Sequence, residues 1–393
     1  MAKTEDPFFY SQLECPVCKT LNEYTNIKMG SYIESGRDTD FCPVGYVWHN
    51  PAFQKYNPLL FFMATCRKCF YTRELNNAYK NWQKDSTFKM YRLKNLQEKH
   101  LGEYMKEGGI LKFLGNHIDQ NKYPFESAVI KFLIGVFDEQ LLEHPSKLDL
   151  GRYFLRIGWL FRVENDLIDG ESSIISGFFL KLKGAVKTAN QILPDYDDKI
   201  KNLKSHIEHD YALVFNGVSQ ADDYKRQIQQ AINEVSSSLE PLINAGEKLE
   251  QIFSKVERAL AGVNEVKNKT FFEFSSFYDF LYKAKELWDE VPLSEREALM
   301  KATEYYREAY EASDKIGQGI GQIQAAYLIA ELSRRTGNHE DADRYFNQMI
   351  RFSRDIIHTQ KGDKSTIKFT KGLLEMAMEQ ARLNRRVSEG AVR

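Results

Sequence analysis

The sequence lacks three features that often assign a protein to a class at once: a long apolar run, an excess of one charge and a catalytic motif. The longest apolar stretch, residues 59–66 (LLFFMATC), is far shorter than the roughly 20 residues of a membrane-spanning helix, so we expect no membrane span. We interpret this stretch as a buried strand. The 54 basic and 55 acidic residues leave a formal charge of -1, which gives no overall attraction to nucleic acid or to an anionic membrane.

No pattern typical of an enzyme is present. The sequence has no glycine-rich phosphate loop, no HExxH motif, no nucleophile elbow and no dinucleotide-binding glycine pattern. Asp38 and Asp40 could form an acid–base pair, but in a turn-like stretch beside aromatic residues they more simply cap or bridge that stretch. The sequence therefore predicts a protein that is not an enzyme.

Cysteine is scarce, and its spacing is the most specific signal in the chain. Four of the five cysteines form two CxxC pairs, Cys15 with Cys18 and Cys66 with Cys69. The N-terminal residues MAKTEDPFFY do not resemble a secretory signal, so we expect a cytoplasmic location, where such pairs favour metal over disulfides. Two pairs supply four thiolates, which complete a tetrahedral site with no open position. We predict a structural zinc site, although iron would use the same ligands.

The fifth cysteine and one histidine lie between the two pairs. Cys42 could be a ligand if one of the other four is not, but a small buried residue is its favoured role, since a fifth thiolate has no place in a tetrahedral shell. His49, in the stretch YVWHN, is expected to be a partly buried strand residue rather than a ligand.

The character of the chain changes after its first 80 residues, which contain most of the strand and turn signals. Beyond them, apolar residues recur at intervals of three and four, as in amphipathic helices. We expect helices over residues 81–107, 124–142, 147–164, 172–193, 197–216, 221–267, 272–289, 293–313, 318–335, 339–358 and 364–385. The sequence thus predicts a mainly α protein with a small β-rich, zinc-ribbon-like domain at residues 1–80.

The N-terminal segment resembles a bacterial family catalogued as a domain of unknown function, number 2225. The resemblance rests on four short stretches: Cys15-Pro-Val-Cys18, Arg37-Asp-Thr-Asp40-Phe41, Asn50-Pro51 and Cys66-Arg-Lys-Cys69. It implies a zinc-ribbon-like domain followed by tetratricopeptide-like helices, and it implies no established activity. The second CxxC pair departs from the family pattern, because it lacks the proline and glycine often found around it.

The helical part has spacings typical of tetratricopeptide repeats. From Ala326 onward, small and large residues occupy the positions of such a helix pair, with a turn at Gly337. A second candidate pair joins residues 154–161 to residues 302–309, which are far apart in the sequence. We therefore predict repeat regions at residues 81–165 and 293–393, separated by an insertion at residues 166–292.

The insertion has the pattern of a helical hairpin. Apolar residues and one glycine alternate at intervals of four and three along residues 228–263, as in a coiled-coil seam, and Pro241 lies inside this run. Residues 200–214 have similar spacing, and Gly217 and Ser219 supply a turn between the two segments. Bundle core and self-associating coiled coil are equally good interpretations, so a homo-oligomer formed through the insertion is possible.

These patterns predict an adaptor or scaffold that binds a protein partner. Repeat helices present aromatic residues, and we expect Tyr305, Tyr310 and Tyr327 to be exposed as partner contacts, whereas Tyr306 and Phe346 occupy packing positions.

The alternative function is a nucleic-acid-associated zinc-ribbon protein. Arg67 and Lys68 lie inside the second CxxC pair, and further basic residues follow. Acidic residues interrupt this basic stretch, so the electrostatic signal for nucleic acid is weak.

Overall fold

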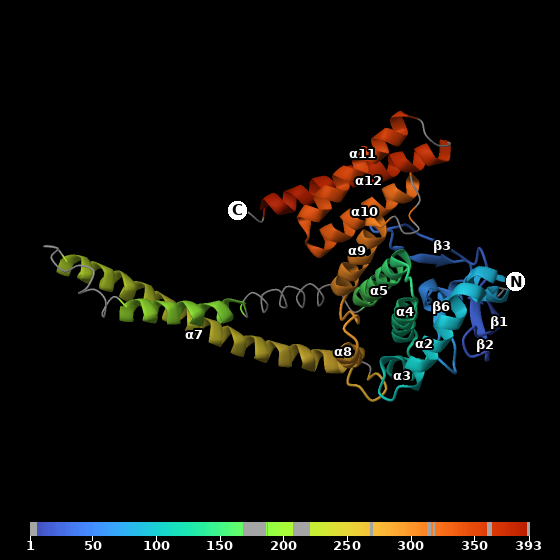
Figure 1. Ribbon diagram of the computed structural model, residues 1–393, viewed down its shortest axis with the longest axis horizontal. Coiled ribbons are helices and arrows are strands. Elements are labelled where there is room, and N and C mark those ends of the chain that lie inside the picture. The colour runs from blue at the N-terminus through green and yellow to red at the C-terminus, as the bar shows by residue number, and fades with distance from the viewer. Residues whose placement is uncertain are drawn as a thin grey trace. The chain divides into compact units, whose positions relative to one another are not determined.

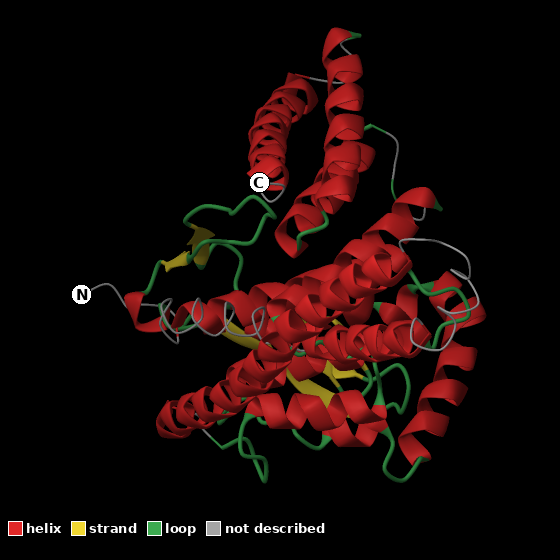
Figure 2. Cartoon of the chain, turned by 90° about the vertical axis from the view of Figure 1, so that its left-hand side faces the viewer, coloured by secondary structure: helices red, strands yellow, loops and turns green. Residues whose placement is uncertain are grey.

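The computed structural model describes residues 6–167, 186, 188–206, 221–267, 270–312, 316, 319–359 and 364–390. The chain divides into two compact units, Met1–Glu164 with Thr270–Arg393 (unit 1) and Asn165–Lys269 (unit 2). Helices dominate, and the named strands lie near the N-terminus (Figure 1, Figure 2). The expected mainly helical fold with a small N-terminal strand-rich region is therefore confirmed. No described helix is long and apolar enough to cross a membrane.

The strand-rich region consists of antiparallel hairpins. Its strands pair in sequence order: β1 (Phe8–Glu14) with β2 (Leu21–Ile27), β3 (Tyr32–Glu34) with β4 (Tyr46–Trp48), and β5 (Met63–Thr65) with β6 (Thr72–Glu74). The first CxxC pair lies in the turn between β1 and β2, and the second lies in the turn between β5 and β6.

The expectation of a strand over residues 59–66 is wrong for its first half. Asn57 caps a 3-10 turn at Pro58–Phe61 by accepting a hydrogen bond from the Leu59 N–H. Pro58 favours such a turn, because its fixed φ and missing N–H suit the first helical position. The strand begins only at Met63, and it leads directly into the second CxxC pair.

The helices of unit 1 follow the expected order with two differences. They are α1 (Asn77–Lys80), α2 (Leu93–Met105), α3 (Ile110–Gly115), α4 (Pro124–Gln140), α5 (Lys147–Leu167, which ends in unit 2), α8 (Phe277–Leu287), α9 (Glu295–Glu311), α10 (Ile320–Thr336), α11 (His339–His358) and α12 (Lys364–Gly390). The single helix expected over residues 81–107 is replaced by a 3-10 turn at Trp82–Lys84, a π-helical turn at Phe88–Arg92 and then α2. The short helices α1 and α3 were not expected.

Side-chain caps fix several of these helix ends. Ser276, Ser294 and Asn338 each accept a hydrogen bond from the backbone N–H three residues later, which satisfies a donor at the start of α8, α9 and α11. Gly337 ends α10 with φ 87°, in the left-handed region where glycine has no steric penalty.

Helices α5 and α9 pack against each other in antiparallel directions, as expected from residues 154–161 and 302–309. Lys147 pairs with Glu308 at 2.7 Å, and Arg162 pairs with Glu295 at the opposite end, also at 2.7 Å. Between them, Gly158 faces Leu299 so closely that an added Cβ would lie 2.8 Å from a methyl carbon. Gly158 therefore permits the two helices to approach closely.

Helix α10 is enclosed by its neighbours α9, α11 and α12. Its residues 325–333 are all buried, and none of them is more than 6% exposed. Tyr327 is 0% exposed. The expectation that Tyr327 is exposed is wrong, because the loop at residues 38–41 covers the side of α10 from which its side chain projects.

A cluster of charged residues joins this loop to the helices, and we call it the Asp40 cluster. Arg162 of α5 binds Asp40 at 2.7 Å, Asp38 at 3.0 Å and Glu295 at 2.7 Å. Arg335 of α10 binds Asp38 at 2.7 Å. The cluster consists of Asp38, Asp40, Arg162, Glu295, Glu331, Arg334 and Arg335. Asp38 and Asp40 thus bridge the loop to the helices.

Unit 2 contains two helical segments that pack in antiparallel directions, residues 188–206 and α7 (Ala221–Lys267). Asn190 lies against Gly246 and donates a hydrogen bond to Glu250 at 2.8 Å, while Lys204 reaches Asn233 at 3.4 Å. The expected helix break near Pro194 is absent, since residues 188–206 are helical throughout. The expected turn at residues 217–219 lies outside the described residues.

The expected insertion, residues 166–292, extends beyond unit 2, which ends at Lys269. Phe271 and Phe280 are 1% and 0% exposed, and their rings lie 4.9 Å apart in the core of unit 1. Phe271 also packs on Tyr123, at 4.9 Å. Residues 270–292 therefore belong with the ranges 1–80, 81–164 and 293–393 in one compact unit.

Candidate metal centre

The two CxxC turns have the same backbone geometry. In the first, the Cys15 N–H donates to Thr20 O at 2.9 Å and the Lys19 N–H donates to Cys15 O at 3.0 Å. In the second, the Cys66 N–H donates to Tyr71 O and the Phe70 N–H to Cys66 O, both at 2.9 Å. Lys19 and Phe70 also match, with φ of 61° and 65°. Phe70 thus adopts the left-handed conformation of the second turn, where glycine would be the favoured residue.

The hairpins bring the four cysteines together. Their sulfur atoms all lie within 4.8 Å of one another, with 3.8 Å between Cys15 and Cys69 and 3.4 Å between Cys18 and Cys66. These distances are too long for disulfides, and all four are free thiols. A tetrahedral ion with metal–sulfur bonds of about 2.3 Å would place its ligands roughly 3.8 Å apart. The spacing of the sulfurs therefore fits one metal ion.

The sulfurs share protons when no cation is bound. The hydrogen bond with Cys66 raises the pKa of Cys15 overall, although the one with Cys69 lowers it, and hydrogen bonds with Cys15 and Cys66 raise the pKa of Cys69. Hydrogen bonds from Cys15 and Cys69 lower the pKa of Cys66. Without a cation, the cluster can therefore hold little negative charge. Four thiolates can coexist here only if a positive ion balances them.

A buried ion pair between His100 and Asp138 supports the second CxxC turn. His100 of α2 is 0% exposed, and its Nε2–H donates to the carbonyl oxygen of Cys69 at 2.8 Å. Its Nδ1 lies 2.6 Å from Asp138 of α4, and the other Asp138 oxygen accepts from the Thr72 N–H at 2.7 Å. Burial lowers the pKa of His100, but the charge and hydrogen bond of Asp138 raise it overall. Helices α2 and α4 thus fix the position of Cys69.

Asn22 links the two turns directly. Its side-chain amide donates to the Cys66 sulfur at 3.4 Å, and its carbonyl oxygen accepts from the Arg67 N–H at 2.9 Å. The other expected residues lie apart from the four sulfurs. Cys42 is buried, 4% exposed, and is not one of the grouped ligands, while His49 is exposed rather than partly buried.

The three predicted partner-binding tyrosines do not form a surface patch. Tyr327 is 0% exposed, and its hydroxyl donates to Thr39 O at 2.7 Å. Tyr305 is half-buried, stacked on Phe154 at 5.6 Å, and Tyr310 packs edge-on against a ring of α11. Partner binding therefore stays a prediction for Tyr305 and Tyr310. The packing positions expected for Tyr306 and Phe346 are confirmed, since both are buried.

Sequence patterns did not indicate the residues that support the metal centre. Two of them, His100 and Asp138, lie far from the CxxC pairs in the sequence, and Asn22 lies outside the CxxC motif. Each is a common residue type. Arg162 and Arg335 were missed for the same reason. Their partners were visible, however, because Asp38 and Asp40 belong to the stretch Arg37-Asp-Thr-Asp40-Phe41 that the family resemblance singled out.

The fold and the site define a mainly helical protein whose small N-terminal strand-rich region contains a four-cysteine site able to hold a metal ion. The chain belongs to the family described as an uncharacterized protein conserved in bacteria (DUF2225), whose model matches residues 8–381. No curated protein and no solved structure matches it.

Proposed function

We propose that this protein is a non-catalytic adaptor or scaffold that binds a protein partner through its helices, while a zinc ion at the four cysteines stabilises a zinc-ribbon-like region. A bound ion would cross-link the two hairpins. Four sulfur ligands would leave no position for water or substrate, so the ion would have a structural role.

The observation that carries the proposal is a line of half-exposed apolar side chains on α7. Ile228, Val235, Leu242 and Leu249 follow one another at intervals of seven residues and are 37%, 49%, 54% and 38% exposed. Intervals of seven place the four side chains along one face of the helix. Exposed apolar surface of this regularity is typical of a helix that packs against another protein chain.

The helices of unit 1 support the same function. Consecutive helices α9, α10, α11 and α12 pack each on the next, as in repeat proteins of the tetratricopeptide type. Helix α5 packs on α9 from a distant part of the sequence, so one repeat would be interrupted by unit 2. Unit 2, with α7, would then be an insertion within a repeat in the sequence.

The test compares proteins that co-purify with the tagged wild-type chain and with two variants. The first variant changes Ile228, Val235, Leu242 and Leu249 to serine. Its matched control changes four exposed polar residues on another face of α7, also at intervals of seven, to alanine: Gln230, Ser237, Asn244 and Gln251. We expect partners that survive the control changes but are lost with the serine variant.

Sedimentation of the purified chains shows whether the partner of α7 is a second copy of this chain or a different protein. If α7 pairs with itself, the wild type and the control will form the same oligomer and the serine variant will be monomeric. If every co-purifying protein binds all three chains equally, the α7 surface does not bind a partner and the proposal fails.

Nucleic-acid association is the second candidate, because Arg67 and Lys68 are both exposed at the second CxxC turn. This function predicts that binding falls steeply with salt, since each phosphate contact releases a counterion. Neutralising both residues would then remove binding, whereas the serine variant of α7 would retain it.

A further inference from the structure

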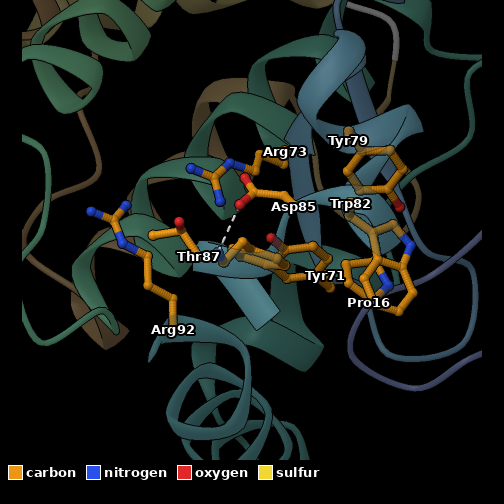
Figure 3. Close-up of a pocket in the computed structure, with 9 residues that line it drawn as sticks. Pro16, Tyr71, Arg73, Tyr79, Trp82, Asp85, Thr87 and Arg92 are labelled. Atoms are coloured by element: carbon orange, nitrogen blue, oxygen red, sulfur yellow. Dashed lines mark hydrogen bonds between the residues drawn. The ribbon is translucent and has the colours of Figure 1, made fainter. Parts of the chain in front are cut away.

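A pocket of about 210 Å³ lies beside the metal centre, with Pro16 of the first CxxC turn in its wall (Figure 3). Aromatic side chains line much of it, and Tyr71, Tyr79, Trp82 and Phe88 are each 9% exposed or less. A cavity of about 150 Å³ is enough to hold a benzene ring. The pocket can therefore hold a ligand of about one ring with a short substituent.

Two arginines give the pocket a polar side. Figure 3 shows the guanidinium groups of Arg73 and Arg92 on one side of the pocket and the rings of Tyr79 and Trp82 on the other. Arg92 is exposed and forms no ion pair among the described residues. Arg73 lies over the Phe88 ring at 5.8 Å, and its ion pair with Glu139 is long, 3.7 Å between Nη2 and Oε2, so its guanidinium has N–H groups that can donate to a ligand.

The charges around the pocket suit one negative charge rather than two. Asp85 also lines the pocket, where its Oδ1 accepts from the Phe88 N–H at 2.9 Å, and Glu139 lies behind Arg73. These two carboxylates equal the two guanidinium groups in number and leave no formal net charge, which disfavours a phosphate dianion. A carboxylate has a single charge and two coplanar oxygens, which match the planar donors of arginine.

The local backbone is unusual at this pocket. Phe88 and Arg92 are the first and last residues of the π-helical turn, and both line the pocket. π-Helical turns are rare and occur frequently at functional sites. Phe88 and Arg92 are four residues apart and share one face of this turn, so the aromatic ring and the guanidinium group reach the same pocket.

We propose that this pocket binds a small carboxylate with a flat apolar body, with the carboxylate on Arg92 and Arg73 and the body among the aromatic rings. Such a group occurs in free aromatic acids and at the C-terminus of a peptide that ends in an apolar residue. No residue of α7 lines the pocket, so this proposal can be tested independently of the proposed adaptor function.

The experiment titrates the full chain with phenylacetate and with the tripeptide Gly-Gly-Phe by calorimetry and ligand-observed NMR. The C-terminal amide of the tripeptide and phenylacetamide are the controls, because each lacks the carboxylate. We expect saturable binding of at least one acid, with a dissociation constant of roughly a millimolar or less, and binding of its amide at least about tenfold weaker. Tighter binding of the tripeptide would identify a peptide C-terminus as the source, and tighter binding of phenylacetate a free acid.

The test variant is Arg92→Gln, and the matched control is Lys94→Gln, which removes an exposed positive charge two residues away that does not line the pocket. We expect Arg92→Gln to weaken binding about tenfold and Lys94→Gln to leave it unchanged. Because both positions are exposed, both variants should unfold at the wild-type temperature. The proposal is overturned if neither acid binds, if amides bind as well as acids, or if the two variants bind alike.

Discussion

The metal centre and the Asp40 cluster both join distant parts of unit 1, but they do so with different chemistry. The metal centre gathers four sulfurs, three of them from buried cysteines, and they need a cation from outside to be stable as thiolates. The Asp40 cluster contains its own cations, since Arg162, Arg334 and Arg335 already form ion pairs with its four carboxylates. One junction should therefore depend on metal supply, and the other only on the chain itself.

The largest effect is expected at the metal centre. Cys66→Ser should lower bound metal from about one ion per chain to nearly none, because the remaining three sulfurs cannot complete a tetrahedral shell. Since metal-binding energy is folding energy in a small region, the first 80 residues should become sensitive to protease. Elemental mass spectrometry of the purified chain measures both the amount of metal and whether it is zinc or iron.

Cys42→Ser is the control for this prediction. Burial raises the pKa of Cys42 to about 12, so it remains a neutral thiol, and it lies outside the group of four. Metal content should not change in this variant. If Cys42→Ser loses the metal and Cys66→Ser keeps it, the ligand set is wrong.

The second effect is expected in the Asp40 cluster. Arg162→Met should cost about 3–5 kcal/mol in the free energy of unfolding, because it leaves the 0% exposed carboxylate of Asp40 without its main cation. Urea titration can follow this loss through tryptophan fluorescence, since Trp159 donates to Asp40 at 3.2 Å.

Arg162→Lys sharpens the same prediction. Lysine keeps the positive charge but cannot reach Asp38, Asp40 and Glu295 together as a planar guanidinium does. We expect the free energy of unfolding of Arg162→Lys to lie between those of the wild type and Arg162→Met. Metal content should be normal in both variants. A loss of metal in Arg162→Met would mean that the two junctions are coupled.

The same contrast explains what the sequence could predict. The cysteine ligands were recognisable because each pair lies within four residues, and α4, α9, α10 and α11 were recognisable from their apolar spacing. The Asp40 cluster was not, because Asp40 and Arg162 are 122 residues apart and no local pattern links them. Tyr327 was misplaced because α10 is covered on several sides, so its apolar spacing could not show which face was exposed.

A third test asks what a buried charge costs when no carboxylate faces it. Lys131 of α4 is 8% exposed and donates to Gln120 at 2.6 Å, with no acidic partner among the described residues. Burial and then the charge of Arg67 lower its pKa from 10.5 to about 8. Between about pH 8 and pH 10.5 the unfolded state binds more protons than the folded state, so the free energy of unfolding should rise with pH in this range.

Lys131→Met should remove this pH dependence. Below pH 8 the variant should be more stable than the wild type by up to about 3 kcal/mol, and the difference should shrink as the pH rises towards 10.5. Urea titrations of both chains across this range measure the difference, in which the titration of other groups cancels. A difference that is constant with pH would show that the pKa of Lys131 is the same in the folded and the unfolded protein.

The smallest effect is expected where the Asp38 to Phe41 loop meets α10. Tyr327→Phe removes only the hydroxyl that donates to Thr39 O at 2.7 Å, while the ring keeps its contact with Phe41 at 5.5 Å. The loss of one buried hydrogen bond should cost about 1 kcal/mol in the free energy of unfolding. Tyr345→Phe is the matched control, because its hydroxyl is 3.4 Å from Glu311 and should contribute little. If both variants unfold at the same urea concentration as the wild type, the hydrogen bond from Tyr327 to Thr39 does not stabilise the attachment of the loop.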